Sequence, residues 1–166
     1  MWESADLGLS YRNGNFIAWA IYMWCKIFRK TKSKFSHSFI IVDKRGNLVE
    51  ASKKVELNHI TDYISNAKQT ITIFRQIDLS DEAKGFIAGF MLSNVGCLYD
   101  VPGFLSFVFP FIKQVRYMWY CSELTNMAYE LSGNPIYPER KEKKISPAEQ
   151  GDWIVQQKNW IKVFEI

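Results

Sequence analysis

Alternating apolar and polar residues mark several short segments of the chain, and a period of two is typical of half-buried β-strands. The clearest pair covers residues 35–42 and 48–55, which are separated by the polar run Asp43-Lys-Arg-Gly-Asn47. That composition is typical of a hairpin turn. Residues 5–12, 70–76 and 160–166 have the same β-rich character. The pattern predicts a small antiparallel sheet.

Apolar residues that recur at steps of three and four predict helices elsewhere. The helical segments are residues 16–29, 59–66, 78–95, 121–131 and a short last helix that begins at 147. Ser80 and Ser146 are placed to cap two of these helices, and Gly133 with the following Asn-Pro ends the helix 121–131. An antiparallel sheet packed against helices is an α+β fold, and 166 residues suffice for one domain, 1–166, with a substantial core.

Three connecting segments complete the expected organisation. Residues 99–103 are expected to form a turn, and the polar, Lys-rich run 135–144 an exposed loop. Between them, Phe104, Phe107, Phe109 and Phe111 form an unusually aromatic stretch. Because large aromatic rings usually serve packing, we expect them to fill the core beneath the helix 121–131. An apolar groove for lipid is the alternative.

Composition narrows the classes of function. Hydrophobic residues make up 48% of the chain and aromatic residues 16%, so the chain is folded rather than disordered. The net charge of +4 comes largely from basic clusters at 26–34 and 140–144, and no zinc-finger or RNP-like motif accompanies them. We therefore expect no nucleic-acid partner. The histidines and cysteines lack the spacing of metal ligands, so neither a metal nor another cofactor is expected.

The most hydrophobic window, residues 16–28, bears on localisation. It is shorter than the ~20 residues that a transmembrane helix needs. We expect a core helix that is followed by basic residues; an interfacial membrane anchor is the less favoured alternative. No signal peptide is visible at the start, and the odd number of cysteines suits a reduced compartment. The expected location is therefore the cytoplasm, or delivery by lysis or in a virion.

Cys121 is the strongest candidate for chemistry. It stands in the first turn of the helix 121–131, where unpaired backbone amides and the helix dipole favour a thiolate. A thiolate nucleophile needs an imidazole as base and a third group that orients the imidazole. His37 on the first hairpin strand and Glu50 on the second are the candidates. Cys25 and Cys97 are expected to be small buried residues.

Each of these three residues also has an ordinary structural interpretation. Cys121 alone would be a buried helix cysteine, His37 a satisfied strand histidine and Glu50 a solvent-facing carboxylate. With a two-residue hairpin loop, His37 and Glu50 share a sheet face but lie too far apart for direct contact. A bulge, strand twist or altered register must close that gap, and the sequence does not decide which.

Several motifs carry a family resemblance. They are the Ser-His strand and the Glu-Ala pair within residues 35–51, Gly-Cys-Leu-Tyr-Asp at 96–100, Tyr-Cys-Ser-Glu-Leu-Thr-Asn-Met-Ala-Tyr at 120–129, and Ser-Pro at 146–147. In this order they resemble the circularly permuted branch of the NlpC-type papain-like superfamily, the YiiX-like amidases, and more distantly lecithin:retinol acyltransferase. The resemblance implies a permuted papain-like fold in which the His strand and the acidic residue precede the Cys helix.

The resemblance also implies roles for single residues. Cys121 would be the nucleophile, His37 the base and Glu50 the orienting acid, and the Cys121 backbone amide would help to hold the oxyanion. Tyr99, Tyr120 and Ser38 are the expected substrate-binding residues.

The leading functional hypothesis is a cysteine hydrolase that cleaves an amide bond in a cell-wall (peptidoglycan) peptide or a related acyl-amide. A lipid-directed thiol acyltransferase or esterase is the second hypothesis, motivated by the aromatic run 104–111 and the apolar N-terminal helix. The third is a non-enzymatic papain-like module of a phage or secretion assembly. Membrane contact is not favoured, and the oligomeric state stays open.

Overall fold

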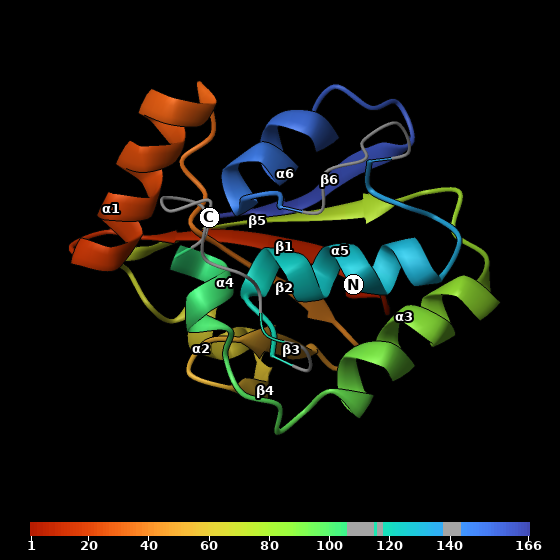
Figure 1. The fold of residues 1–166 in the computed structure, drawn as a ribbon. Helices are drawn as coiled ribbons and strands as arrows, with labels where there is room; N and C mark the ends of the chain where they lie inside the picture. The colour runs from red at the N-terminus through yellow and green to blue at the C-terminus, as the bar shows by residue number, and fades with distance from the viewer. Residues whose placement is uncertain (106–114, 116–117, 138–143) are drawn as a thin grey trace.

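The computed structural model describes residues 1–105, 115, 118–137 and 144–166. These residues form an α+β fold around a six-stranded antiparallel sheet with strand order β4-β3-β2-β1-β5-β6 (Figure 1). The strands are β1 (Asp6–Arg12), β2 (His37–Ile41), β3 (Asn47–Ala51), β4 (Val55–His59), β5 (Gln69–Gln76) and β6 (Trp160–Glu165). The expected antiparallel sheet packed against helices is therefore confirmed.

The helices also follow the predicted segments. They are α1 (Phe16–Trp24) with the π-helical turn η1 (Cys25–Arg29), α2 (Ile60–Ile64), α3 (Asp81–Ser93), α4 (Val101–Leu105), α5 (Cys121–Leu131) and α6 (Pro147–Ile154). Ser80 accepts a hydrogen bond from the Ala83 amide, and Ser146 forms a capping box with Glu149. Gly133 takes a positive φ of 79° directly after α5, as the stop signal predicted.

The sheet is covered on both faces. Leu9, Ile40 and Val49 belong to the core cluster that includes residues of α3 and α5. Phe39 and Leu48 belong to a second cluster on the opposite face, beneath α2. Because β1, β2 and β3 are sandwiched in this way, their central residues are buried on both faces. The central strands are thus a rigid base for any side chain at their ends.

Three predictions about segments need correction. The run 48–55 is not one strand: β3 ends at Ala51, the chain turns through 52–54, and β4, which was not predicted, begins at Val55. The turn expected at 99–103 leads into α4 instead. The loop expected to be exposed at 135–144 buries Ile136 and Tyr137 in the core. Its residues 138–143, and 106–114 of the aromatic stretch, lie outside the described part of the chain.

The prediction that residues 16–28 form a core helix is wrong. Helix α1 stands at the edge of the molecule (Figure 1), and the exposed fractions of Phe16 and Trp19 are 76% and 50%. Cys25, at the start of η1, is buried as expected, and Cys97 is partly buried. Among the described residues no helix is long and apolar enough to cross a membrane.

Candidate active site

The turn between β2 and β3 determines how His37 and Glu50 meet. Asp43 Oδ1 accepts hydrogen bonds from the amides of Arg45, Gly46 and Asn47, and Gly46 takes a positive φ of 95°. The Val42 amide already pairs with the Asn47 carbonyl, so the loop has four residues rather than two. The pairing is therefore shifted by two residues from the simple register.

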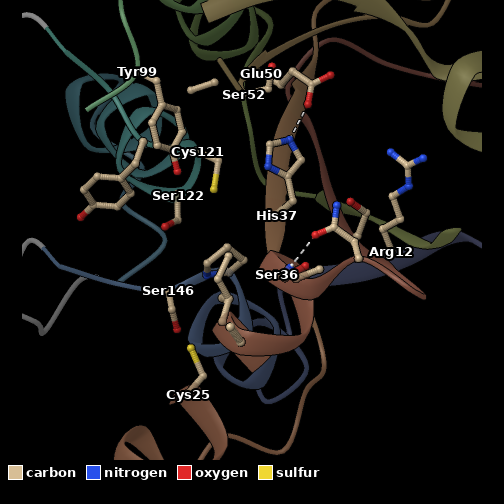
Figure 2. A pocket seen from close by; sticks show the side chains of 18 of the residues that line it. Arg12, Cys25, Ser36, His37, Glu50, Ser52, Tyr99, Cys121, Ser122 and Ser146 are labelled. Carbon is tan, nitrogen blue, oxygen red and sulfur yellow. Dashed lines mark hydrogen bonds and ion pairs between the residues drawn. The ribbon is translucent and has the colours of Figure 1, made fainter. Parts of the chain in front are cut away.

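In the shifted register Glu50 lies opposite Phe39, two residues along β2 from His37. Diagonal neighbours of this kind are within reach of long side chains. His37 Nε2 and Glu50 Oε2 form a hydrogen-bonded ion pair, which Figure 2 marks. An altered register thus closes the gap that the simple hairpin leaves.

Glu50 is held by more than the histidine. Its Oε2 also accepts a hydrogen bond from the Tyr63 hydroxyl at 2.5 Å, and its Oε1 accepts one from Asn58 Nδ2 at 2.7 Å. Burial alone would raise the pKa of Glu50, but His37 and these two donors outweigh it and lower that pKa to about 2. The carboxylate is therefore charged and fixed at neutral pH. Asn58 and Tyr63 were missed in the sequence because they belong to β4 and α2, which carry no motif.

His37 lies between Glu50 and Cys121 (Figure 2). Because Nε2 is engaged by Glu50, Nδ1 is the ring nitrogen that faces the sulfur. Burial disfavours the charged imidazolium, but the negative charges of Cys121 and Glu50 prevail and raise the pKa of His37 to about 10. The histidine is therefore an imidazolium at neutral pH and donates a hydrogen bond on each side.

Cys121 begins α5, with Tyr120 as its N-cap residue. Burial raises the pKa of its thiol, but the charge and hydrogen bond of His37 and the backbone amides of Ser38 and Ser122 prevail, so the pKa lies below its ordinary value. The structure thus brings the three candidates together in a row, with the pKa of the Cys121 thiol lowered, that of His37 raised and that of Glu50 lowered.

A cavity of about 790 Å³ opens beside these residues. Cys121, His37 and Glu50 lie in its wall, and Tyr99 and Tyr120 line it as expected. Another part of its wall comes from the apolar helix α1 and from η1. It is formed by Phe16, Ala18, Ala20, Ile21, Trp24 and Cys25. The site is therefore a large cavity whose lining combines the three candidate residues with apolar side chains of α1 and with polar residues such as Arg12 and Gln69.

Two serines differ from expectation. The Ser38 side chain is fully buried beneath α5, 3.4 Å from the Thr125 hydroxyl, and does not line the cavity. Ser38 reaches the site through its backbone amide, which contacts the Cys121 sulfur. Ser122, which was not predicted, lines the cavity, and its buried hydroxyl has no hydrogen-bond partner among the described residues. Its position next to Cys121 was the only signal for it.

Other motif residues support the site from behind. Asp100 is fully buried, and its carboxylate accepts hydrogen bonds from the amides of Gly103 (2.8 Å) and Val115 (3.2 Å). It thereby fixes the chain next to Tyr99. Tyr129, the last residue of the motif at 120–129, is buried and donates its hydroxyl hydrogen to the Ala5 carbonyl. These residues fix the loop and helix that bear Tyr99 and Cys121.

Comparison with protein-family models and with curated protein sequences found no match. The geometry alone therefore defines the site. The site places a cysteine thiol beside a histidine that a carboxylate holds, an arrangement that suits nucleophilic catalysis. No cluster of three or more potential metal ligands occurs in the part of the chain that the structure describes.

Proposed function

We propose that this chain is a cysteine hydrolase that cleaves an amide bond through a covalent acyl-enzyme on Cys121. The observation that carries the proposal is the row Cys121–His37–Glu50 at the wall of a large cavity, in which His37 helps to lower the pKa of the Cys121 thiol. A pKa depressed by a specific charge partner within a cavity is typical of a catalytic group.

Each residue has a defined role in the proposed reaction. The Cys121 thiolate attacks the carbonyl carbon, and the backbone amide of Cys121, unpaired at the helix start, helps to stabilise the oxyanion. The His37 imidazolium then donates its proton to the departing amine, which leaves a thioester. In the second step neutral His37 takes a proton from water and the hydroxide attacks the thioester carbon. The C–S bond then breaks, the carboxylic acid leaves, and the Cys121 thiolate is regenerated beside the His37 imidazolium. Glu50 keeps the imidazole in orientation throughout.

The same arrangement supports a circularly permuted papain-like, NlpC-type fold as our structural proposal. The strand that bears His37 and the strand that bears Glu50 precede α5 along the chain, and α5 packs on the sheet with Cys121 at its first turn. The sequence motifs at 35–51 and 120–129 meet at this junction. Peptides of the cell wall are the amide substrates that we favour.

A second candidate, a thiol acyltransferase or esterase that takes lipid-derived acyl groups, is favoured by one observation. Part of the cavity wall consists of apolar side chains of α1 and η1, among them Ile21 and Trp24. An acyl chain bound along that wall would lose its contact with water. The reacting thioester is the same, so the two candidates differ in the acyl donor and acceptor.

A panel of acyl donors tests the proposal. We expect a thioester on Cys121 when the protein is mixed with its acyl donor, seen as an added acyl mass in intact-protein mass spectrometry and removed by neutral hydroxylamine. The panel contains muropeptides, N-acyl amides of increasing chain length and phospholipids. Muropeptides as the best donors support amide hydrolysis; long-chain esters as the best donors replace it with the lipid candidate.

The control for this experiment is Cys97→Ser, which removes a thiol outside the cavity and should form the adduct normally. Absence of an adduct from every donor, in a protein whose Cys121 is no more reactive than Cys97, would contradict catalysis and favour the non-enzymatic module.

A further inference from the structure

Helix α1 and the turn η1 present an apolar surface to solvent. The exposed fractions of Phe16, Trp19, Ile27 and Phe28 are 76%, 50%, 59% and 68%. Phe16 packs beside Trp19, and Phe28 beside Trp24, with ring centroids 5.8 Å apart in both pairs. We call the four exposed residues Phe16, Trp19, Ile27 and Phe28 the α1 surface. Exposed apolar side chains clustered on one element usually mark a surface that another body covers.

Positive charge predominates around the α1 surface. The sequence has no Asp or Glu from residue 7 to residue 42. The lysines and arginines of this stretch are Arg12, Lys26, Arg29, Lys30, Lys32 and Lys34. Two carboxylates approach from α6: Glu149 lies 4.0 Å from Arg29, and Asp152 accepts the backbone amides of Lys32 and Ser33. Lys26, Lys30, Lys32 and Lys34 are exposed and form no ion pair within the described residues.

From these observations we propose that the α1 surface docks onto an anionic lipid bilayer. Aromatic and aliphatic side chains would enter the headgroup region, and the lysines would meet lipid phosphates. Residues 16–29 extend about 21 Å as a helix, less than the ~30 Å of a hydrocarbon core, so α1 lies in the interface and does not cross the bilayer. This inference goes beyond the proposed function and does not rest on it.

The same charges argue against two other occupants. A second copy of the chain, packed symmetrically on this surface, would bring the two lysine clusters together, and like charges repel. A nucleic acid would satisfy the lysines but leave the exposed Phe28 and Ile27 in water. A bilayer with anionic headgroups would cover the exposed apolar side chains and also pair with the lysines.

Docking would also orient the cavity. Phe16 belongs to the α1 surface and at the same time lines the cavity. Ala18, Ile21 and Trp24 of α1 also line this cavity, in whose wall Cys121 lies. Helix α1 thus belongs both to the proposed docking surface and to the cavity that holds the candidate site, so a molecule that leaves the bilayer at α1 would meet the cavity directly.

Vesicle sedimentation tests the proposal with the full chain. We expect the protein to bind vesicles of phosphatidylcholine mixed with phosphatidylglycerol, with residual binding in high salt, and to bind pure phosphatidylcholine more weakly. Trp19→Ser and Phe28→Ser should each weaken binding about tenfold, because each removes an aromatic side chain from the bilayer. The double variant Lys26→Gln, Lys30→Gln should lose much of the vesicle binding that high salt abolishes in the unchanged protein.

Phe86→Ser is the matched control, since Phe86 is an exposed phenylalanine on α3; it should bind as the unchanged protein does. Circular dichroism verifies the fold of each variant, and Cys121 alkylation reports the site separately, so loss of docking and loss of catalysis are distinguishable. The proposal is overturned if the protein does not bind vesicles, or if Phe28→Ser and Trp19→Ser leave the binding unchanged. It is also overturned if Phe86→Ser weakens binding as much as they do, or if the protein is a dimer that Trp19→Ser dissociates.

Discussion

His37→Asn is expected to reduce turnover by about a thousandfold or more while the protein stays folded. Asparagine cannot donate a proton to the leaving amine or accept one from water. It also removes the charge that opposes burial of the Cys121 thiolate, so the pKa of Cys121 should rise above its ordinary value. Both the nucleophile and the proton donor are therefore lost together. Hydrolysis of the best donor from the acyl panel measures the effect, with circular dichroism for the fold.

Cys121→Ser should be equally inactive, because the pKa of a serine hydroxyl is far too high for His37 to hold it ionised. The two losses should not add, since the residues act as one unit: the double variant should be no slower than either single variant. Retention of substantial turnover by either single variant would contradict the proposed roles. His59, which caps α2 and bonds to the Arg45 carbonyl, offers a histidine control, and His59→Asn should keep full turnover.

Glu50→Gln is expected to reduce turnover by about a hundredfold and to leave measurable activity. The glutamine carbonyl oxygen can still accept the Nε2 hydrogen of His37, so part of the orientation survives. The negative charge that raises the pKa of His37 is gone, so that pKa falls from about 10. The thiolate–imidazolium pair should then be lost at lower pH. The alkaline limb of the pH–rate profile should accordingly move toward neutral pH.

The pH–rate profile separates this effect from simple destabilisation, which would lower activity without moving the limb. Glu130→Gln, an exposed carboxylate at the other end of α5, is the control and should leave the profile unchanged. A fully active Glu50→Gln with an unshifted profile would make Glu50 a bystander, and another group would have to orient His37.

Local chemistry explains which parts of the fold could be predicted from the sequence. Ser80 and Ser146 cap their helices as expected because capping depends only on residues three positions away. Strand β4 was missed because the turn at 52–54 contains no glycine or proline and left residues 48–55 looking like one strand. Helix α1 was placed correctly along the chain, but a helix that is hydrophobic all round does not reveal which of its faces is covered.

In the candidate site, too, the features that depend on local sequence could be predicted and those that depend on the folded chain could not. Cys121 was identifiable because a helix start follows from the sequence, and His37 and Glu50 because they stand on adjacent strands. Their contact depends on the four-residue turn that Asp43 caps, and such a register is set by side-chain hydrogen bonds rather than by strand pattern. Asn58 and Tyr63, which hold Glu50, come from separate elements that only the folded chain brings together.

The rate at which iodoacetamide alkylates Cys121, followed against pH by peptide mass spectrometry, tests the central claim most directly. A thiolate paired with His37 predicts that Cys121 reacts at a nearly constant rate from below neutral pH upward, while Cys25, whose pKa burial raises, reacts slowly throughout. In the His37→Asn variant the alkylation rate of Cys121 should increase only above pH ~8.5, the ordinary thiol pKa. A Cys121 curve that rises only near pH ~8.5 in the unchanged protein, and that His37→Asn does not move, would contradict the account.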